Sequence, residues 1–184
     1  MSSQPTDLPL VGTFTGMPAS AYVRDLRAKV GSEMIMFPGV SAAVFNDAGE
    51  ILLGQRSDNG RWSLIAGMVD PGEQPADAIT REVREETGVE VAIDRIAGVA
   101  LHQVAYPHGD LCQYMNTWFR CRAVGGEARV NDDESLAVAW FALDALPELN
   151  EFSRLRIRTA QPEHAPTWFA PPGTDPSELG ISGW

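Results

Sequence analysis

The chain has 184 residues, of which 44% are apolar and 21% charged, and this composition excludes a disordered, collagen-like or disulfide-scaffold protein. Its formal net charge is −11 at pH 7. So acidic a surface repels the phosphates of nucleic acids and of anionic membranes. We therefore expect neither a long nucleic acid nor a membrane as a partner.

The predicted elements follow from hydrophobic periodicity and from residues that start and stop helices and strands. The clearest is a helix over residues 75–87. Pro75 suits its first turn, Asp77 its positive N-terminal end and Gly88 its stop. In chain order, we predict a helix over 20–30, strands over 40–46, 51–56 and 62–66, the helix over 75–87, strands over 89–93, 96–106, 111–124 and 136–141, and a helix over 150–160.

These elements make one α+β domain with ordered extensions. We divide the chain into an N-terminal leader with a short helix (1–36), a central domain (37–160) and a Pro-rich tail (161–184). The tail keeps Trp168 and Trp184, so we expect it to pack on the body or on a partner.

The expected compartment is the cytoplasm. No basic segment precedes an apolar one, and the longest uncharged run, residues 8–23, is broken by prolines and glycines. Cys112 and Cys121 lie nine residues apart in one predicted strand, so alternation points them to opposite faces and no disulfide is expected between them.

The negative charge gathers in two segments. Residues 67–89 hold six acidic residues against two basic ones, and residues 127–151 hold seven against one. Solvated helix faces are the ordinary reason for such clusters. Two of them in one small protein also suit convergence on a divalent cation.

The predicted helix at 75–87 carries three glutamates at helical spacing. Glu82, Glu85 and Glu86 project from one face, beside an apolar stripe formed by Ile79 and Val83. Like charges so close raise one another's pKa unless a cation lies between them. Mg²⁺ takes oxygen ligands and keeps substrate phosphates in its shell, so this pattern indicates the hydrolysis of phosphoanhydrides.

The longer pattern around these glutamates is more specific. Gly67, five residues, Glu73, seven residues and then Arg81-Glu-Val-Arg-Glu-Glu-Thr-Gly-Val89 meet all nine fixed positions of a 23-residue motif. The motif resembles the Nudix box of the Nudix hydrolases, without a substitution. The resemblance extends over about residues 38–147, where residues 138–141 and 143–146 resemble the family's usual last strand and helix.

The resemblance implies a Nudix fold, an α/β/α sandwich with a mixed β-sheet flanked by helices. It also implies cleavage, dependent on Mg²⁺ with Mn²⁺ as a substitute, of the diphosphate in a nucleoside diphosphate linked to another group. ADP-ribose, a dinucleoside polyphosphate or a nucleoside triphosphate would be such a substrate.

The same resemblance assigns roles by position. The metal ligands are Glu82, Glu85, Glu86 and the carbonyl of Gly67, while Glu73 and Arg81 support the loop and the helix. The general base in this family is a box glutamate, here Glu82 or Glu85, or a carboxylate on a distant loop. The candidate on that loop is the run Asp132-Asp133-Glu134, of which we take Glu134 as the catalytic residue, and a solvated acidic turn is the alternative.

Substrate contacts lie outside the motif. Arg56 ends a strand that leads toward the site and suits a phosphate or a base, although a surface ion pair is as good an interpretation. Trp62 and Tyr106 suit stacking on a base, and simple packing is the alternative for each. The distance of Tyr106 from the box resembles that in diadenosine polyphosphate hydrolases of the family.

Three other functions compete with hydrolysis. A non-catalytic Nudix domain that senses a nucleotide metabolite is the main alternative, although the ligand set is intact. A Nudix-fold isoprenoid isomerase needs a cysteine and histidine arrangement that we cannot place here. The third is a domain that serves only as a dimer scaffold.

We also expect a homodimer, formed through the helix at 20–30 or through the aromatic tail.

Overall fold

The computed structural model describes residues 21–105 and 111–179, so Tyr106 lies outside the described residues. Its elements follow one another as α1 (Ala21–Val30), β1 (Ile35–Phe45), β2 (Ile51–Arg56), β3 (Trp62–Ser63), β4 (Ile65–Met68), α2 (Pro75–Thr87), β5 (Val89–Ala105), β6 (Leu111–Gly126), β7 (Ser135–Phe141), α3 (Glu151–Ala160), β8 (Trp168–Phe169) and the 3₁₀ helix η1 (Pro176–Leu179).

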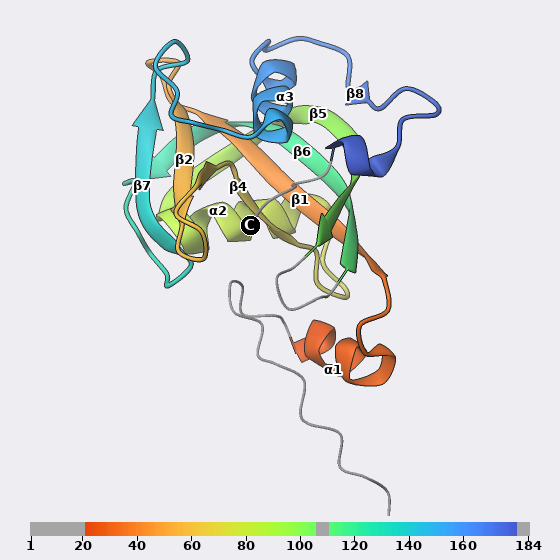
Figure 1. Ribbon diagram of the computed structural model, residues 1–184. Coiled ribbons are helices and arrows are strands. Elements are labelled where there is room, and N and C mark those ends of the chain that lie inside the picture. Colours follow the sequence, from red (N-terminus) through yellow and green to blue (C-terminus); the bar gives the residue numbers. More distant parts are fainter. Residues whose placement is uncertain (1–20, 106–110, 180–184) are drawn as a thin grey trace, which may run out of the picture.

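The described strands join in one mixed sheet in the order β3-β2-β1-β6-β5-β8, with β4 also paired to β1 and β7 to β2. Strand β1 runs parallel to β6 and antiparallel to β2 and β4. Helices α2 and α3 flank this sheet (Figure 1). The predicted α/β/α sandwich with a mixed sheet is therefore confirmed.

Strand β1 is buried on both faces because a helix covers each of them. Ala43 and Phe45 belong to the core under α3, with Phe152 and Ile157. The alternate residues of the strand, such as Val44, belong to the second core, to which α2 contributes. Alternation of the side chains thus explains why residues 42–45 are all apolar and buried.

The sheet differs from the prediction at several places. Strand β1 begins at Ile35 and not at residue 40, and strand β8 was not predicted. Residues 89–105 form one strand, where we predicted a break after residue 93, because shifts in the pairing register with β6 at Ile93/Arg95 and Ile96/Gly98 absorb the irregularity. The predicted strand at 62–66 divides into β3 and β4 at Leu64, which is buried.

The prediction of a helix at residues 143–146 is wrong. This segment is a turn, in which the Ala145 N–H donates to the Ala142 carbonyl (3.0 Å). The helix follows later, as α3, and begins as predicted after Asn150, whose side chain accepts the Ser153 N–H (2.7 Å).

The segment after α3 lies on the sheet. Strand β8 pairs with β5, and the rings of Trp168 and Trp118 lie 5.5 Å apart. Gly98 lacks the Cβ that would meet the Trp118 ring at 2.1 Å, so the indole fits closely against the strand. Cys112 and Cys121 are both buried. No described helix is both long and apolar enough to cross a bilayer.

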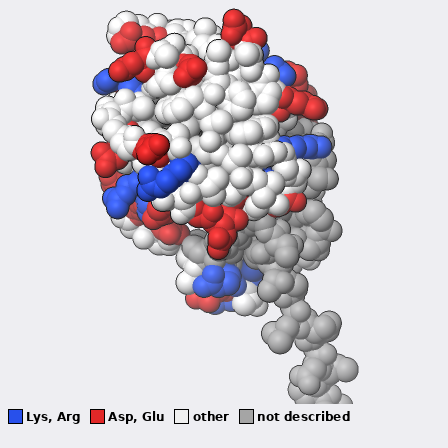
Figure 2. All heavy atoms as spheres, turned by 90° about the vertical axis from the view of Figure 1, so that its left-hand side faces the viewer, with Lys and Arg blue, Asp and Glu red and all other residues white. Residues whose placement is uncertain are grey.

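Charges are spread unevenly over the face shown in Figure 2, which is the left-hand side of Figure 1. Carboxylates form separate groups toward the upper and lower edges, arginines stand among them, and the middle of the face is largely uncharged. A phosphate that approaches the described part of this face therefore meets no broad basic patch.

Candidate active site

Helix α2 brings the box glutamates to the sheet. Pro75 begins it, and Gly88 ends it in the left-handed conformation (φ 72°), with its N–H donating to the Arg84 carbonyl. Ile79 and Val83 are fully buried and fix which face of the helix meets the sheet. The box glutamates that border this face are therefore held close to the sheet.

The three glutamates do not point the same way. At about 100° per residue, Glu86 lies about 40° from Glu82 on the side of the buried stripe, and Glu85 lies about 60° away on the other side. The side chain of Glu82 is accordingly 18% exposed and that of Glu85 59%. Only Glu82 and Glu86 therefore lie toward the sheet.

Gly67 of β4 lies directly beneath Glu82. A Cβ at this position would fall 2.1 Å from the Glu82 carboxyl carbon and from one of its oxygens. The glycine thus allows the carboxylate to lie against the strand, next to the backbone of residue 67.

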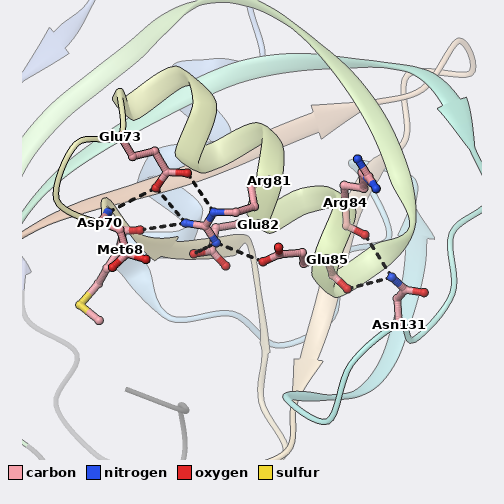
Figure 3. Close-up of polar contacts among 8 residues, drawn as sticks. All are labelled: Met68, Asp70, Glu73, Arg81, Glu82, Arg84, Glu85 and Asn131. Atoms are coloured by element: carbon pink, nitrogen blue, oxygen red, sulfur yellow. Dashed lines mark hydrogen bonds and ion pairs between the residues drawn. The ribbon is translucent and has the colours of Figure 1, made fainter. Parts of the chain in front are cut away.

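Arg81 organises the loop and the helix (Figure 3). Its Nε and Nη2 donate to the two carboxylate oxygens of Glu73 at 2.9 and 3.0 Å. Its Nη1 donates to Glu82 (2.9 Å) and to Glu85 (3.1 Å), and its Nη2 also donates to the Met68 carbonyl (3.3 Å). The hydrogen bond from Arg81 is the main cause that lowers the pKa of Glu73, so this pair remains ionised.

The loop before β7 is tied to the end of α2. Asn131 donates to two carbonyls in the last turn of α2, that of Arg84 (3.2 Å), which also accepts the Gly88 N–H, and that of Glu85 (3.0 Å). The Glu134 N–H donates to Asp132, and the Glu134 carbonyl accepts the Ser57 N–H (2.8 Å). These bonds bring the second acidic segment to the box.

The carboxylates of the two segments influence one another. Burial raises the pKa of Glu86 well above its ordinary value, and the charges of Glu82, Glu134 and Asp132 raise it further. Burial, and then Asp132 and Glu82, raise the pKa of Glu134 to about 7. Burial also raises the pKa of Glu82, against the opposing effect of Arg81. The negative charge of these carboxylates is therefore concentrated in one place, and nearby positive charges compensate only part of it.

A cavity adjoins this acidic group. Gly67, Glu86 and Glu134 line it, together with Arg56 and Trp62. The charge of Arg56 lowers the pKa of both Glu86 and Glu134, and its guanidinium also pairs with Asp58. Trp62 packs edge-on against Phe141 (4.9 Å between ring centroids). Both residues thus face the cavity and also make the ordinary contacts expected as alternatives. Glu85 lies instead in a separate hollow with Arg81 and Asp77.

Several polar or aromatic residues line the cavity that the sequence did not indicate. Among them are His102, Tyr114, Asn116 and Arg156. They come from β5, β6 and α3, at ordinary strand or helix positions that no local motif marks. Strand alternation places His102 on the same face as Val104, which also lines the cavity.

The acidic group suits a hard cation by its chemistry. Glu82, Glu86 and Glu134 supply carboxylate oxygens, and a cation between them would offset the repulsion that raises their pKa values. Within residues 21–105 and 111–179, no three His, Cys, Asp or Glu side chains already surround one point as a ready metal site. In Figure 3, Arg81 engages Glu82 and Glu85.

Comparison with known proteins places this fold and motif in a family. The NUDIX domain matches residues 36–161. The chain therefore belongs to the Nudix family, and the resemblance carried by residues 67–89 is confirmed.

The similar proteins include several kinds of Nudix protein. A MutT-like protein of Streptomyces ambofaciens is 34% identical over 116 residues, which are 59% of this chain and 66% of that protein. The NAD-capped RNA hydrolase NudC of Pseudomonas aeruginosa is 37% identical over 102 residues, which are 54% of this chain but 34% of NudC. The structure of an ADP-ribose pyrophosphatase from Streptococcus suis gives a TM-score of 0.57 at 29% identity and covers 73% of this chain and 98% of that one. The chain thus spans less than two thirds of the first two proteins.

The contact between Gly67 and Glu82 leads to a prediction. Gly67→Ala is expected to displace the Glu82 carboxylate from the strand and from Arg81, and to lower the free energy of unfolding by about 1–2 kcal/mol. In a Glu82→Ala background the same change should cost much less, because the clashing group is gone. Chemical denaturation of the four proteins measures this coupling. Equal costs in the two backgrounds would show that the contact is unimportant.

Proposed function

We propose that this protein is a divalent-metal-dependent pyrophosphatase that cleaves the diphosphate of a nucleoside diphosphate linked to another group. The observation that carries the proposal is the convergence of Glu82 and Glu86 from α2 with Glu134 from the loop before β7. The charge of Glu82 raises the pKa of both Glu86 and Glu134, and the charge of Glu134 raises that of Glu86, beside a cavity of a Nudix fold.

The proposed metal is Mg²⁺, for which Mn²⁺ can substitute. The proposed ligands are the Gly67 carbonyl, Glu82 and Glu86, with Glu85 joining them after it turns away from Arg81. When bound, the cation supplies positive charge to the diphosphate and lowers the pKa of the attacking water. Glu73 and Arg81 hold the loop and helix that position these ligands.

Glu134 is the proposed general base. It faces the cavity, and its pKa of about 7 matches that of a base working near neutrality. The box alternatives, Glu82 and Glu85, both accept hydrogen bonds from Arg81, which occupies carboxylate oxygens that a base would need. Arg81 therefore acts in catalysis by holding these two carboxylates.

The proposed substrate is a small nucleotide derivative. The net charge of −11 disfavours a long polyanion, whereas a cation at the acidic group would admit a single diphosphate. Arg56 suits a substrate phosphate next to Glu86 and Glu134, and Trp62 suits stacking on a base. Tyr106 remains a further stacking candidate. The ADP-ribose pyrophosphatase among the similar proteins supports this class.

Turnover of a substrate panel by the pure protein tests the proposal. With Mg²⁺, we expect hydrolysis of at least one of ADP-ribose, diadenosine polyphosphates, ordinary or oxidised nucleoside triphosphates and nucleotide sugars, followed by chromatography of the products. No turnover of any compound would contradict it. Tight binding without turnover, unaffected by Glu85→Gln, would favour the nucleotide sensor instead.

Domain organisation, assembly and location complete the proposal. We keep the division into 1–36, 37–160 and 161–184. Helix α1 exposes Tyr22, and Met34 and Met36 near it are also exposed, which supports a homodimer formed through this end. A monomer mass in solution would refute the dimer. The proposed location is the cytoplasm, supported by a low cysteine content: the sequence has two cysteines, and both are buried.

A further inference from the structure

Arg156 is a buried cation in the wall of the cavity. Its residue is 4% exposed, and it lines the cavity from α3. Its guanidinium lies 4.5 Å from the centroid of the Phe152 ring. Nη2 donates to the Ser153 hydroxyl (3.2 Å) and Nε makes a long bond to the Phe152 carbonyl (3.4 Å). In the described part of the chain, no carboxylate forms an ion pair with it. Arginines so deeply buried are nearly always paired.

The carboxylates at the acidic group do not supply the missing charge. Burial lowers the pKa of Arg156 to about 10 and is the sole cause of the shift. A carboxylate close enough to compensate the guanidinium would raise its pKa instead. Glu86 and Glu134 line the same cavity, but Arg56 is the arginine that acts on them. Arg156 is thus electrostatically separate from the proposed metal site.

His102 presents a second unused polar group to the same cavity. It is 6% exposed, and its Nδ1 is buried without a hydrogen-bond partner among the described residues. Its ring stacks on Tyr114 (5.4 Å) and lies 4.8 Å from Phe152, so it is fixed in place. Burial and the charge of Arg156 lower the pKa of His102 to about 3, so the imidazole is neutral at pH 7.

Arg156 and His102 are both buried, line the same cavity and can each make further hydrogen bonds. A ligand that bonds to both would satisfy them. Water would satisfy His102 but would leave the Arg156 charge uncompensated. A compact oxyanion compensates the charge and accepts hydrogen bonds from the guanidinium, and neutral His102 donates to it from its protonated nitrogen.

We propose that Arg156 and His102 form a subsite for a second oxyanion of the substrate, a phosphate monoester or a carboxylate, distinct from the diphosphate that is cleaved. The proposal rests on the proposed function of this cavity. It narrows the substrate to a nucleoside diphosphate derivative that carries one further anionic group. A derivative with only neutral sugars outside the diphosphate would leave Arg156 unsatisfied.

Phosphate binding to the metal-free protein tests the subsite without requiring hydrolysis. With metal removed, the acidic group repels phosphate, so binding reports on Arg156. Inorganic phosphate at constant ionic strength is expected to raise the unfolding temperature of the wild type by about 2–4 °C, and not that of Arg156→Met. Arg158→Met, which removes an exposed arginine of the same helix, is the control and should respond as the wild type does.

The stability of Arg156→Met without phosphate separates binding from folding. Removing an unpaired buried charge should leave the unfolding temperature unchanged or raise it, whereas loss of a structural group would lower it. The inference is overturned if phosphate fails to stabilise the wild type more than Arg156→Met.

Pairs of substrates that differ by one anionic group then show which oxyanion the subsite recognises. NADPH differs from NADH by one phosphate monoester, and UDP-glucuronic acid differs from UDP-glucose by one carboxylate. The wild type is expected to prefer the more anionic member of one pair by about tenfold or more in kcat/KM, and Arg156→Met should bring that ratio close to one. A ratio near one for both pairs in the wild type would contradict the proposal. Absence of all hydrolysis would instead refute the proposed function, and the phosphate experiment would still stand.

Discussion

Glu86→Gln is expected to lower the rate of hydrolysis by about 10³-fold or more while the protein stays folded. Glu86 is the box glutamate turned furthest toward the buried stripe, and it lines the cavity with Gly67 and Glu134. The amide keeps the shape of the side chain but removes the charge that a cation needs. Steady-state kinetics at saturating Mg²⁺ measure the loss, and circular dichroism checks the fold.

The three box glutamates should not be equivalent. Glu85→Gln is expected to cost clearly less than Glu86→Gln, because the Glu85 side chain is 59% exposed and held by Arg81 beside a separate hollow. Asp77→Asn, on the same helix but far from the cavity wall, serves as the control and should change the rate little. Equal losses for Glu85 and Glu86 would contradict this difference and would mean that the two glutamates bind the cation equally strongly.

Glu134→Gln is expected to lower kcat by about 10²–10⁴-fold, the usual contribution of a general base. Glu134 has a pKa raised to about 7 by burial and by Asp132 and Glu82. The neighbouring Asp133 is exposed, so Asp133→Asn is a matched control that should keep nearly full activity. Wild-type activity in Glu134→Gln would move the role of base to Glu82 or Glu85.

Glu134→Gln lowers activity, but in the absence of metal it is expected to raise the stability of the fold at high pH. The folded protein holds the Glu134 proton more tightly than the unfolded chain, whose pKa is near 4.5. The wild type therefore loses stability as the pH rises from about 4.5 to 7, and the penalty is complete above that range. At pH 8, Glu134→Gln should unfold at a higher temperature than the wild type, and at pH 4 the two should be similar. Thermal unfolding with a chelator measures both, and a lower temperature for the variant at pH 8 would contradict the origin of the shift.

Local signals predicted the helix that carries the chemistry. Pro75 and Gly88 fixed the ends of α2, and the spacing of Ile79 and Val83 predicted its buried face. The direction of Glu85 was missed, since residues three or four apart were treated as one face although they spread over about 100° around the helix. The single strand β5 was missed because its bulges near Asp94 look like a break in a local pattern.

Long-range packing determined the rest of the site. His102 and Arg156 line the same cavity only because α3 packs over the sheet. Nothing within a few residues of either one marks it as functional. Glu134 was a candidate from its position before a strand, but its proximity to the box depends on Asn131 bonding to the end of α2. Such contacts between distant segments are beyond the reach of periodicity and motif spacing.

The rate of hydrolysis measured as Mg²⁺ is added to metal-free protein tests the central claim most directly. The reaction uses whichever panel compound is turned over, with product formation followed by chromatography. We predict no turnover without the metal, a saturable rise as Mg²⁺ is added, and a comparable rise with Mn²⁺. Turnover by the metal-free protein at the full rate would contradict a cation held by Glu82 and Glu86.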